Sequence, residues 1–121
     1  MNFDSQHLAS DLDALDAATI DELPFGVIKL DAQNRVQIYS KAEARLSGFG
    51  TRPALGLDFF VSIAPCMNTA QFRGRIDEAM ADGTLDLELG HTGDFADRAR
   101  KLRARVVSAD GGGVWIVMKR A

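Results

Sequence analysis

The chain has 121 residues, of which 46% are hydrophobic, 26% charged and 7% aromatic. This composition predicts one soluble globular domain and excludes disordered and collagen-like chains. The sequence contains no run of about 18 apolar residues, and its first segment is acidic where a secretory signal carries positive charge. We therefore expect a cytoplasmic protein that is neither secreted nor inserted in a membrane.

Charge is distributed unevenly along the chain. Residues 1–24 hold six of the 17 acidic residues and no lysine or arginine, which leaves residues 25–121 with a net charge of +3. The overall charge of −3 argues against indiscriminate nucleic-acid binding. Cys66 is the single cysteine, which excludes an internal disulfide, and with only two histidines beside it we expect no metal site.

The first half of the chain predicts helices on either side of a β-hairpin. Leucines at helical spacing and the turn residues between apolar runs indicate these elements. In chain order they are one or two short amphipathic helices within residues 5–17, strands at 26–31 and 36–39, a helix from Ser40 toward Leu46, and one or two helical turns within 53–60.

The second half predicts one longer helix followed by three strands. The helix contains Phe72, Ile76, Ala79 and Met80 on one face, with Asn68 or Thr69 as its cap and Gly83 as its terminator. The strands are expected at 85–89, 102–107 and 114–119, with a glycine-rich turn at 110–113 before the last.

The last of these strands is apolar on both faces, so both faces must be covered. The acidic segment 1–24 is the expected cover for the second face. A basic row, Lys101, Arg103 and Arg105, lies on one face of the neighbouring strand and could meet that acidic cover. This row lacks the stacking aromatic residues that single-stranded nucleic acid needs, so nucleic acid is not an expected partner.

Two strands, several small helices and three further strands form the order of the PAS fold. The expected class is therefore α+β, with a five-stranded antiparallel sheet, helices on one face and an N-terminal helical cap on the other. We expect the cap to span residues 1–24 and the PAS core residues 25–121, within a single domain. This fold does not by itself define a ligand or an activity.

Four segments resemble the photoactive yellow protein family. They are Leu23–Gly26, Tyr39–Glu43, the phrase Asp58–Cys66 with its Phe-Phe-x-x-x-Ala-Pro-Cys pattern, and the terminal Trp115–Arg120. The resemblance covers nearly the whole chain from about Leu23. It implies a blue-light receptor that is not an enzyme and that carries p-coumaric acid (4-hydroxycinnamic acid) as a thioester on Cys66.

The resemblance also implies a set of chromophore-binding residues. Tyr39 and Glu43 match the partners of the phenolate, and Ser47 matches the hydroxyl that supports the tyrosine. The pocket is expected to be completed by Phe49, Phe59, Pro65 and Phe95.

The residue types suit this chemistry. Cys66 is the only thiol, and a position after a proline at a helix start would favour the reactive thiolate. Glu43 can donate to a phenolate only while protonated, a form that burial favours. After isomerisation and proton transfer, an unpaired buried carboxylate would remain and could release a weakly docked cap as the signal.

The sequence departs from the family pattern in two places. Phe49 stands where the family usually has an arginine over the pocket, and Arg52 lies nearby without aligning. Residues 90–98 lack the aromatic and methionine side chains that speed the thermal return, and only Phe95 could substitute. We therefore expect slow dark recovery and a shifted spectrum.

Other interpretations remain open. The chain could be a PAS module that binds a different small ligand or none, or an enzyme that uses Cys66 as a nucleophile with His7 or His91 as base. His91 could ligate a haem. Individual residues could also be ordinary: Cys66 a buried apolar side chain, and Tyr39 a surface aromatic.

Glu43 also has an ordinary interpretation, as part of a capping box with Ser40. Partners are open as well: we expect an unidentified downstream signalling protein, no nucleic acid, no membrane, and a monomer or weak dimer.

Overall fold

The computed structural model describes residues 1–83 and 85–120, so position 84 and the last residue of the expected PAS core lie outside it. Its helices and turns are α1 (Leu8–Asp13), α2 (Ala17–Ile20), α3 (Lys41–Ser47), the π-helical turn η1 (Phe59–Ile63), the 3-10 turn η2 (Pro65–Met67) and α4 (Arg73–Ala81). Its strands are β1 (Gly26–Leu30), β2 (Val36–Tyr39), β3 (Asp86–Thr92), β4 (Lys101–Ser108) and β5 (Val114–Arg120).

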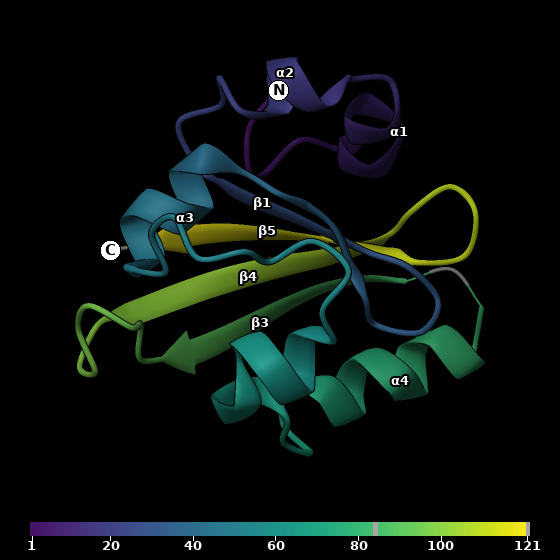
Figure 1. The fold of residues 1–121 in the computed structure, drawn as a ribbon. Coiled ribbons are helices and arrows are strands. Elements are labelled where there is room, and N and C mark those ends of the chain that lie inside the picture. Colours follow the sequence, from purple (N-terminus) through teal and green to yellow (C-terminus); the bar gives the residue numbers. More distant parts are fainter. Residues whose placement is uncertain (84, 121) are drawn as a thin grey trace.

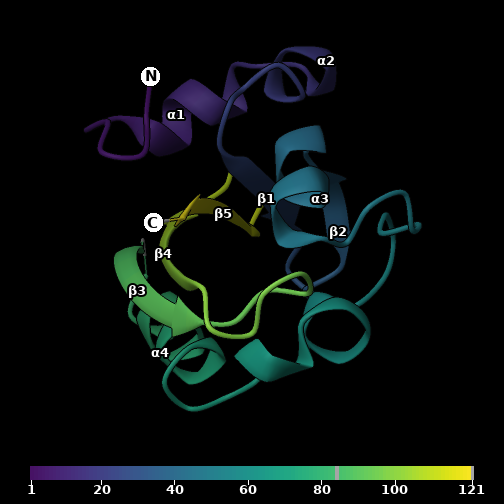
Figure 2. The ribbon, with the colours of Figure 1, turned by 90° about the vertical axis from the view of Figure 1, so that its left-hand side faces the viewer.

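The strands form one antiparallel sheet in the order β2-β1-β5-β4-β3. Helix α4 lies below this sheet in Figure 1, and α1 and α2 lie above it. Figure 2 shows how the sheet curves around the side that carries α3, η1, η2 and α4. The α+β PAS architecture with an N-terminal cap on the opposite face is thus confirmed.

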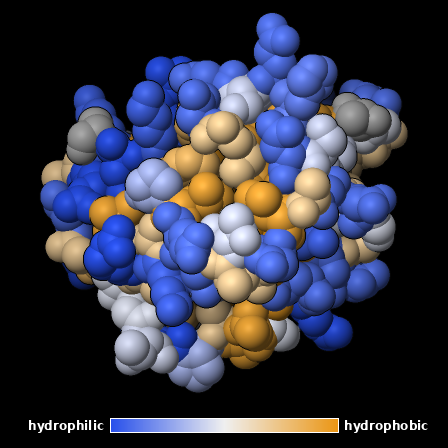
Figure 3. Space-filling model, turned by 90° about the horizontal axis from the view of Figure 1, so that it is seen from above, coloured by the Kyte–Doolittle hydropathy of each residue, from blue (hydrophilic) through white to orange (hydrophobic). Residues whose placement is uncertain are grey.

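The central strand β5 separates two apolar clusters. Ile116 and Met118 point into the main core, whereas Trp115 and Val117 point toward the cap, by which we mean residues 1–24. There they meet buried side chains of the cap: Phe3, Leu8, Leu12 and Ile20. The expectation that the cap covers the second face of the last strand is therefore confirmed. Figure 3 looks down on this side, where hydrophilic side chains surround a smaller apolar area.

The basic row on β4 contacts both the cap and the neighbouring strand β3. Arg105 reaches the cap, where it donates to the backbone carbonyl oxygens of Phe3 and Ser5 and is also stabilised by the charge of Asp4. Its carboxylate partner is Asp86 on β3, at 2.8 Å. Arg103 likewise pairs with Glu88 of β3. Antiparallel pairing with β3 places these acids directly beside the row, which the linear sequence does not reveal.

Two helical predictions are corrected. The turns expected within residues 53–60 begin only at Phe59, where the Asp58 side chain caps the backbone N–H groups of Phe60 and Val61. The longer helix begins at Arg73, later than a cap at Asn68 or Thr69 would require. The Thr69 hydroxyl instead accepts the N–H of Phe72 in the turn that precedes the helix.

Among residues 1–83 and 85–120, no helix combines the length and apolar character needed to span a bilayer.

Candidate functional site

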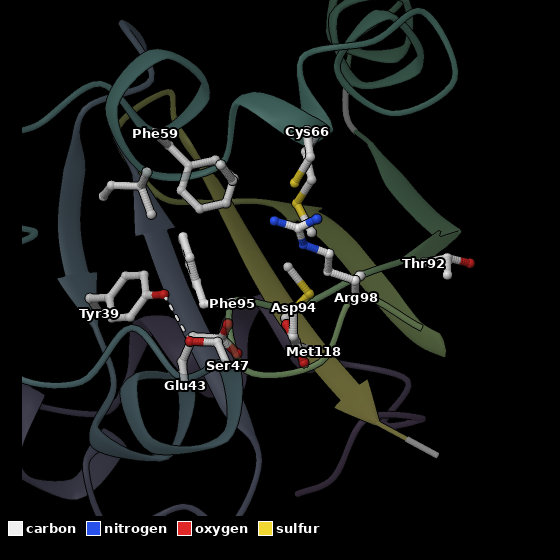
Figure 4. Close-up of a pocket in the computed structure, with 14 residues that line it drawn as sticks. Tyr39, Glu43, Ser47, Phe59, Cys66, Thr92, Asp94, Phe95, Arg98 and Met118 are labelled. Atoms are coloured by element: carbon white, nitrogen blue, oxygen red, sulfur yellow. Dashed lines mark hydrogen bonds between the residues drawn. The ribbon is translucent and has the colours of Figure 1, made fainter. Parts of the chain in front are cut away.

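A cavity of about 430 Å³ lies between α3, the η1–η2 segment, β5 and the loop after β3 (Figure 4). Six of the eight predicted site residues line it: Tyr39, Glu43, Ser47, Phe59, Cys66 and Phe95. The sequence did not single out the other eight: Ile63, Ala64, Met67, Thr92, Gly93, Asp94, Arg98 and Met118. The cavity therefore joins residues from distant parts of the chain around one space.

Cys66 occupies one end of the cavity, and Tyr39, Glu43 and Ser47 occupy the other (Figure 4). The cysteine lies in η2, with Pro65 at the first position of that turn. It is a free and exposed thiol rather than a buried apolar side chain. The expected position after a proline at a helix start is therefore confirmed for this short 3-10 turn, whereas the longer helix α4 begins only at Arg73. The proline nevertheless fixes the backbone φ angle immediately before the thiol.

Tyr39 ends β2 and directs its hydroxyl toward Ser47 of α3, with the two oxygens 3.5 Å apart. The Ser47 oxygen already accepts the backbone N–H of Phe49, so its own proton is available for the tyrosine oxygen. In that arrangement the phenolic proton of Tyr39 can serve a ligand in the cavity. Burial, and after it the charge of Glu43, raise the pKa of Tyr39 well above its ordinary value. Tyr39 is thus a donor at neutral pH, and its hydroxyl is not the surface group considered above.

Glu43 is 3% exposed, although it stands in the first turn of a short helix. The backbone N–H of Ser40 donates to the Val27 carbonyl, at 2.9 Å, and so does not pair with Glu43 as a capping box would require. The Ser40 hydroxyl does cap α3, because it accepts the N–H of Glu43 at 3.2 Å. This capping leaves the Glu43 carboxylate free to point inward.

Gly26 of β1 makes the room for this carboxylate. A Cβ atom at this position would overlap the Oε1 atom of Glu43. The glycine is thus required by close approach rather than by a turn.

The Glu43 carboxylate is held by Arg120 at the end of β5. The Nη1 and Nη2 atoms of Arg120 donate to its two oxygens at 2.9 and 2.8 Å. The same guanidinium donates to Asp94, through Nε at 2.7 Å and Nη2 at 3.1 Å. Burial raises the pKa of Glu43, and the hydrogen bond and charge of Arg120 oppose this rise. The expectation that an ionised Glu43 would be unpaired is therefore wrong.

Two predicted site residues, Phe49 and Pro65, do not line the cavity. Phe49 is 6% exposed and lies one layer behind it, with its ring centroid 5.2 Å from Tyr39 and 5.4 Å from Phe95. Arg52 stacks on this group, with its guanidinium carbon 4.7 Å from the Phe49 ring centroid and 5.0 Å from that of Phe95. Arg52 therefore places a positive charge close to the cavity, but it stacks on the rings of Phe49 and Phe95 and does not line the cavity itself.

Neither histidine joins the cavity. His91 points edge-on toward Phe72, with ring centroids 5.9 Å apart, and burial lowers its pKa. His7 precedes α1 in the cap, on the other side of the sheet. Within the part of the chain that the structure describes, Cys66 therefore shares its cavity with no histidine, which argues against a cysteine–histidine enzyme.

Comparison with named proteins identifies the family. A photoactive yellow protein of Rhodothalassium salexigens is 36% identical over 104 residues, which cover 85% of this chain and 83% of that protein. The chain belongs to the photoactive yellow protein family. A photoactive yellow protein of Halochromatium salexigens is 29% identical over 121 residues, covering 99% of this chain and 97% of that protein. No model of a protein family matches the chain.

Solved structures agree with this assignment. The photoactive yellow protein domain of the sensor histidine kinase Ppr from Rhodospirillum centenum superposes with a TM-score of 0.81 and 31% identity, over 92% of this chain and 98% of that domain. A PAS domain from Colwellia psychrerythraea shares the fold alone, with a TM-score of 0.60 and 13% identity, over 87% of this chain and 92% of that chain. The chain is thus a photoreceptor of the photoactive yellow protein type built on a PAS fold.

Proposed function

We propose that this chain is a blue-light receptor that holds p-coumaric acid as a thioester on the Sγ atom of Cys66. The observation that carries the proposal is the single cavity that joins this thiol to Tyr39 and Glu43 at its far end. Its volume of about 430 Å³ lies within the range of small-molecule pockets. When bound, the chromophore would supply light absorption and isomerisation of its double bond.

The lining residues fit an elongated ligand with an apolar middle and one anionic end. Phe59, Ile63 and Met118 line the apolar part, and Phe95 lies at the loop. Tyr39 would donate its hydroxyl proton to the phenolate, supported by Ser47. Glu43 would donate a second hydrogen bond while protonated, a state that its burial favours.

The signal would come from proton loss at Glu43. When Glu43 ionises, it adds a buried negative charge beside Arg120 at the end of β5. This strand also carries Trp115 and Val117, on which the cap rests. Release of the cap toward an unidentified signalling protein is the output we propose, with the receptor acting as a monomer or weak dimer and without catalysis.

Mixing the purified chain with an activated p-coumaric ester tests the proposal. We expect a mass increase of one coumaroyl group on Cys66 and a visible band that bleaches in blue light. Cys66→Ala should lose the adduct and the colour together. Glu43→Gln should keep the adduct, shift the band and hinder proton transfer.

An unmodified Cys66 would contradict the proposal. It would leave the alternative of a PAS module that binds another small ligand or none.

A further inference from the structure

One buried cation links the proposed proton donor to the loop at the mouth of the cavity. Arg120 makes two hydrogen bonds to Glu43 of α3 and two to Asp94 of the 93–100 loop, all between 2.7 and 3.1 Å. The three side chains are 7%, 4% and 5% exposed, respectively. A single guanidinium therefore serves two largely buried carboxylates that both line the cavity.

The charge of this cluster depends on one proton. With both acids ionised, the three side chains carry a net charge of −1, and with Glu43 protonated they are neutral; Arg100, 3.8 Å from Asp94, adds a positive charge at the solvent-exposed edge. An uncompensated charge is expensive in a buried site. Arg120 bonds to Asp94 through its Nε and Nη2 atoms. Its positive charge therefore stays paired with the Asp94 carboxylate even when Glu43 is protonated.

We propose that Arg120 is a positioning residue that controls when Glu43 gives up its proton, and that it holds the resulting carboxylate so that the light-activated state is prolonged. This inference rests on the proposed function. In the step concerned, the O–H bond of Glu43 breaks and its proton passes to the anionic phenol oxygen. The negative charge then moves from that oxygen to the Glu43 carboxylate, which Arg120 meets in the geometry already present.

The charged and titratable groups around Glu43 define the alternatives. Tyr39 faces it from β2, and Arg98 and Cys66 share its cavity. Another cation, Arg100, lies 3.8 Å from Asp94 and donates to the carbonyl of Leu46. Arg100 thus touches the same acid as Arg120 without bonding to Glu43, which makes it a matched control.

The first experiment needs no chromophore. The carboxylic C=O band of Glu43, assigned as the band missing in Glu43→Gln, is followed by infrared titration of the full unliganded chain. Arg120→Gln should raise the apparent pKa of Glu43 by about 1–3 units, because an adjacent opposite charge is lost. Asp94→Asn should lower it, because a neighbouring negative charge is removed and Arg120 turns wholly to Glu43.

Two further variants separate charge from structure. Arg120→Lys keeps the cation and should leave the apparent pKa of Glu43 close to that of the parent. Arg100→Gln should move it much less than Arg120→Gln. Because Asp94→Asn and Arg120→Gln are expected to move it in opposite directions, general unfolding cannot produce the result. If Arg120→Gln does not fold, the Asp94→Asn and Arg120→Lys titrations still decide the question.

The second experiment uses the coumaroylated chain. Arg120→Gln should shorten the lifetime of the bleached state about tenfold or more, which corresponds to one or more units of pKa. Asp94→Asn should lengthen it. Equal titrations for Arg120→Gln and Arg100→Gln would overturn the inference, even if Cys66 is acylated. Failure of acylation would instead overturn the proposed function, while the infrared titration still decides the role of Arg120.

Discussion

Asp13 of α1 accepts a hydrogen bond from the indole Nε1 of Trp115 at 2.7 Å, and this contact ties the cap to the central strand of the sheet. Trp115 is 1% exposed, so its N–H has no access to water as a substitute partner. We expect Asp13→Ala to lower the free energy of unfolding by about 1–3 kcal/mol. Urea unfolding followed by circular dichroism and by the single tryptophan measures this loss.

Asp11→Ala is the matched control, because it removes the same charge from the exposed side of the same helix. It should change the stability much less. Limited proteolysis should cut within residues 1–24 of Asp13→Ala sooner than in the control. Equal stabilities and equal cleavage rates would show that the Trp115 contact does not hold the cap.

Gly26→Ala tests the close approach of β1 to the site. The new methyl group would overlap the Glu43 carboxylate, so Glu43 must move and the cluster around Arg120 must rearrange. Overpacking of this kind costs about 1–3 kcal/mol. We expect lower stability, and in the coumaroylated chain a shifted visible band, measured by thermal unfolding and absorption.

Gly90→Ala is the control for that substitution. Gly90 also lies in a strand, yet an added methyl group would meet no atom within 4 Å. Its stability and spectrum should stay close to those of the parent. A Gly26→Ala variant with an unchanged spectrum would mean that Glu43 does not need the space that the glycine leaves.

Much of the fold was predictable because apolar and polar side chains alternate with period two along strands, and because glycine, proline, asparagine and aspartate mark the turns between them. The central strand shows this best, since its two apolar faces required two layers of cover. Boundaries were less accurate. β3 continues through Gly90 to Thr92, where the sequence suggested an end at Leu89, because pairing with β4 supports the extra residues.

The candidate site was predictable only where a family motif marked it. Tyr39, Glu43 and Cys66 were found in this way, and the cavity unites them. Arg120 was named only as the last residue of a family-like segment and was given no role at the site, because its partner Glu43 lies 77 positions away in the sequence. Asp94 and Arg98 belong to a polar loop with no periodic signal. Such contacts form between segments that are far apart in the sequence. Local sequence patterns do not reveal them.

Stability at acid pH should depend on Asp86, which pairs with Arg105 beside the cap. The hydrogen bond from Arg105 lowers the pKa of Asp86 below its ordinary value of 3.8. The stabilisation is therefore fully present above about pH 3.8 and is lost as the pH falls through the lowered folded-state value. We expect Asp86→Asn to flatten the loss of stability in this range.

Unfolding in urea between pH 5 and pH 2 measures this slope. Asp77→Asn is the control, because Asp77 pairs with Arg73 only at 3.7 Å on the exposed side of α4. The control should keep the parent slope. An Asp86→Asn curve parallel to the parent curve down to pH 2 would contradict the linkage.

Phe95 should set the rate at which the coumaroylated receptor returns to its dark state. It is the one aromatic side chain that residues 90–98 bring to the cavity, and it is 48% exposed. The Phe95 ring also contacts the guanidinium of Arg52 and the ring of Phe49, so only part of the ring can contact a ligand. We expect slow recovery in the parent chain and a further slowing of about two- to tenfold in Phe95→Ala, as an aromatic contact is lost.

Flash photolysis of the loaded protein measures both rates. Val61→Ala is the control, because Val61 is an exposed apolar residue that does not line the cavity. It should recover at the parent rate. Fast recovery in the parent, or a Phe95→Ala variant indistinguishable from Val61→Ala, would show that the thermal return is governed elsewhere. In that case the lifetime of the bleached state in Arg120→Gln would measure how much the cluster of Glu43, Arg120 and Asp94 contributes to the thermal return.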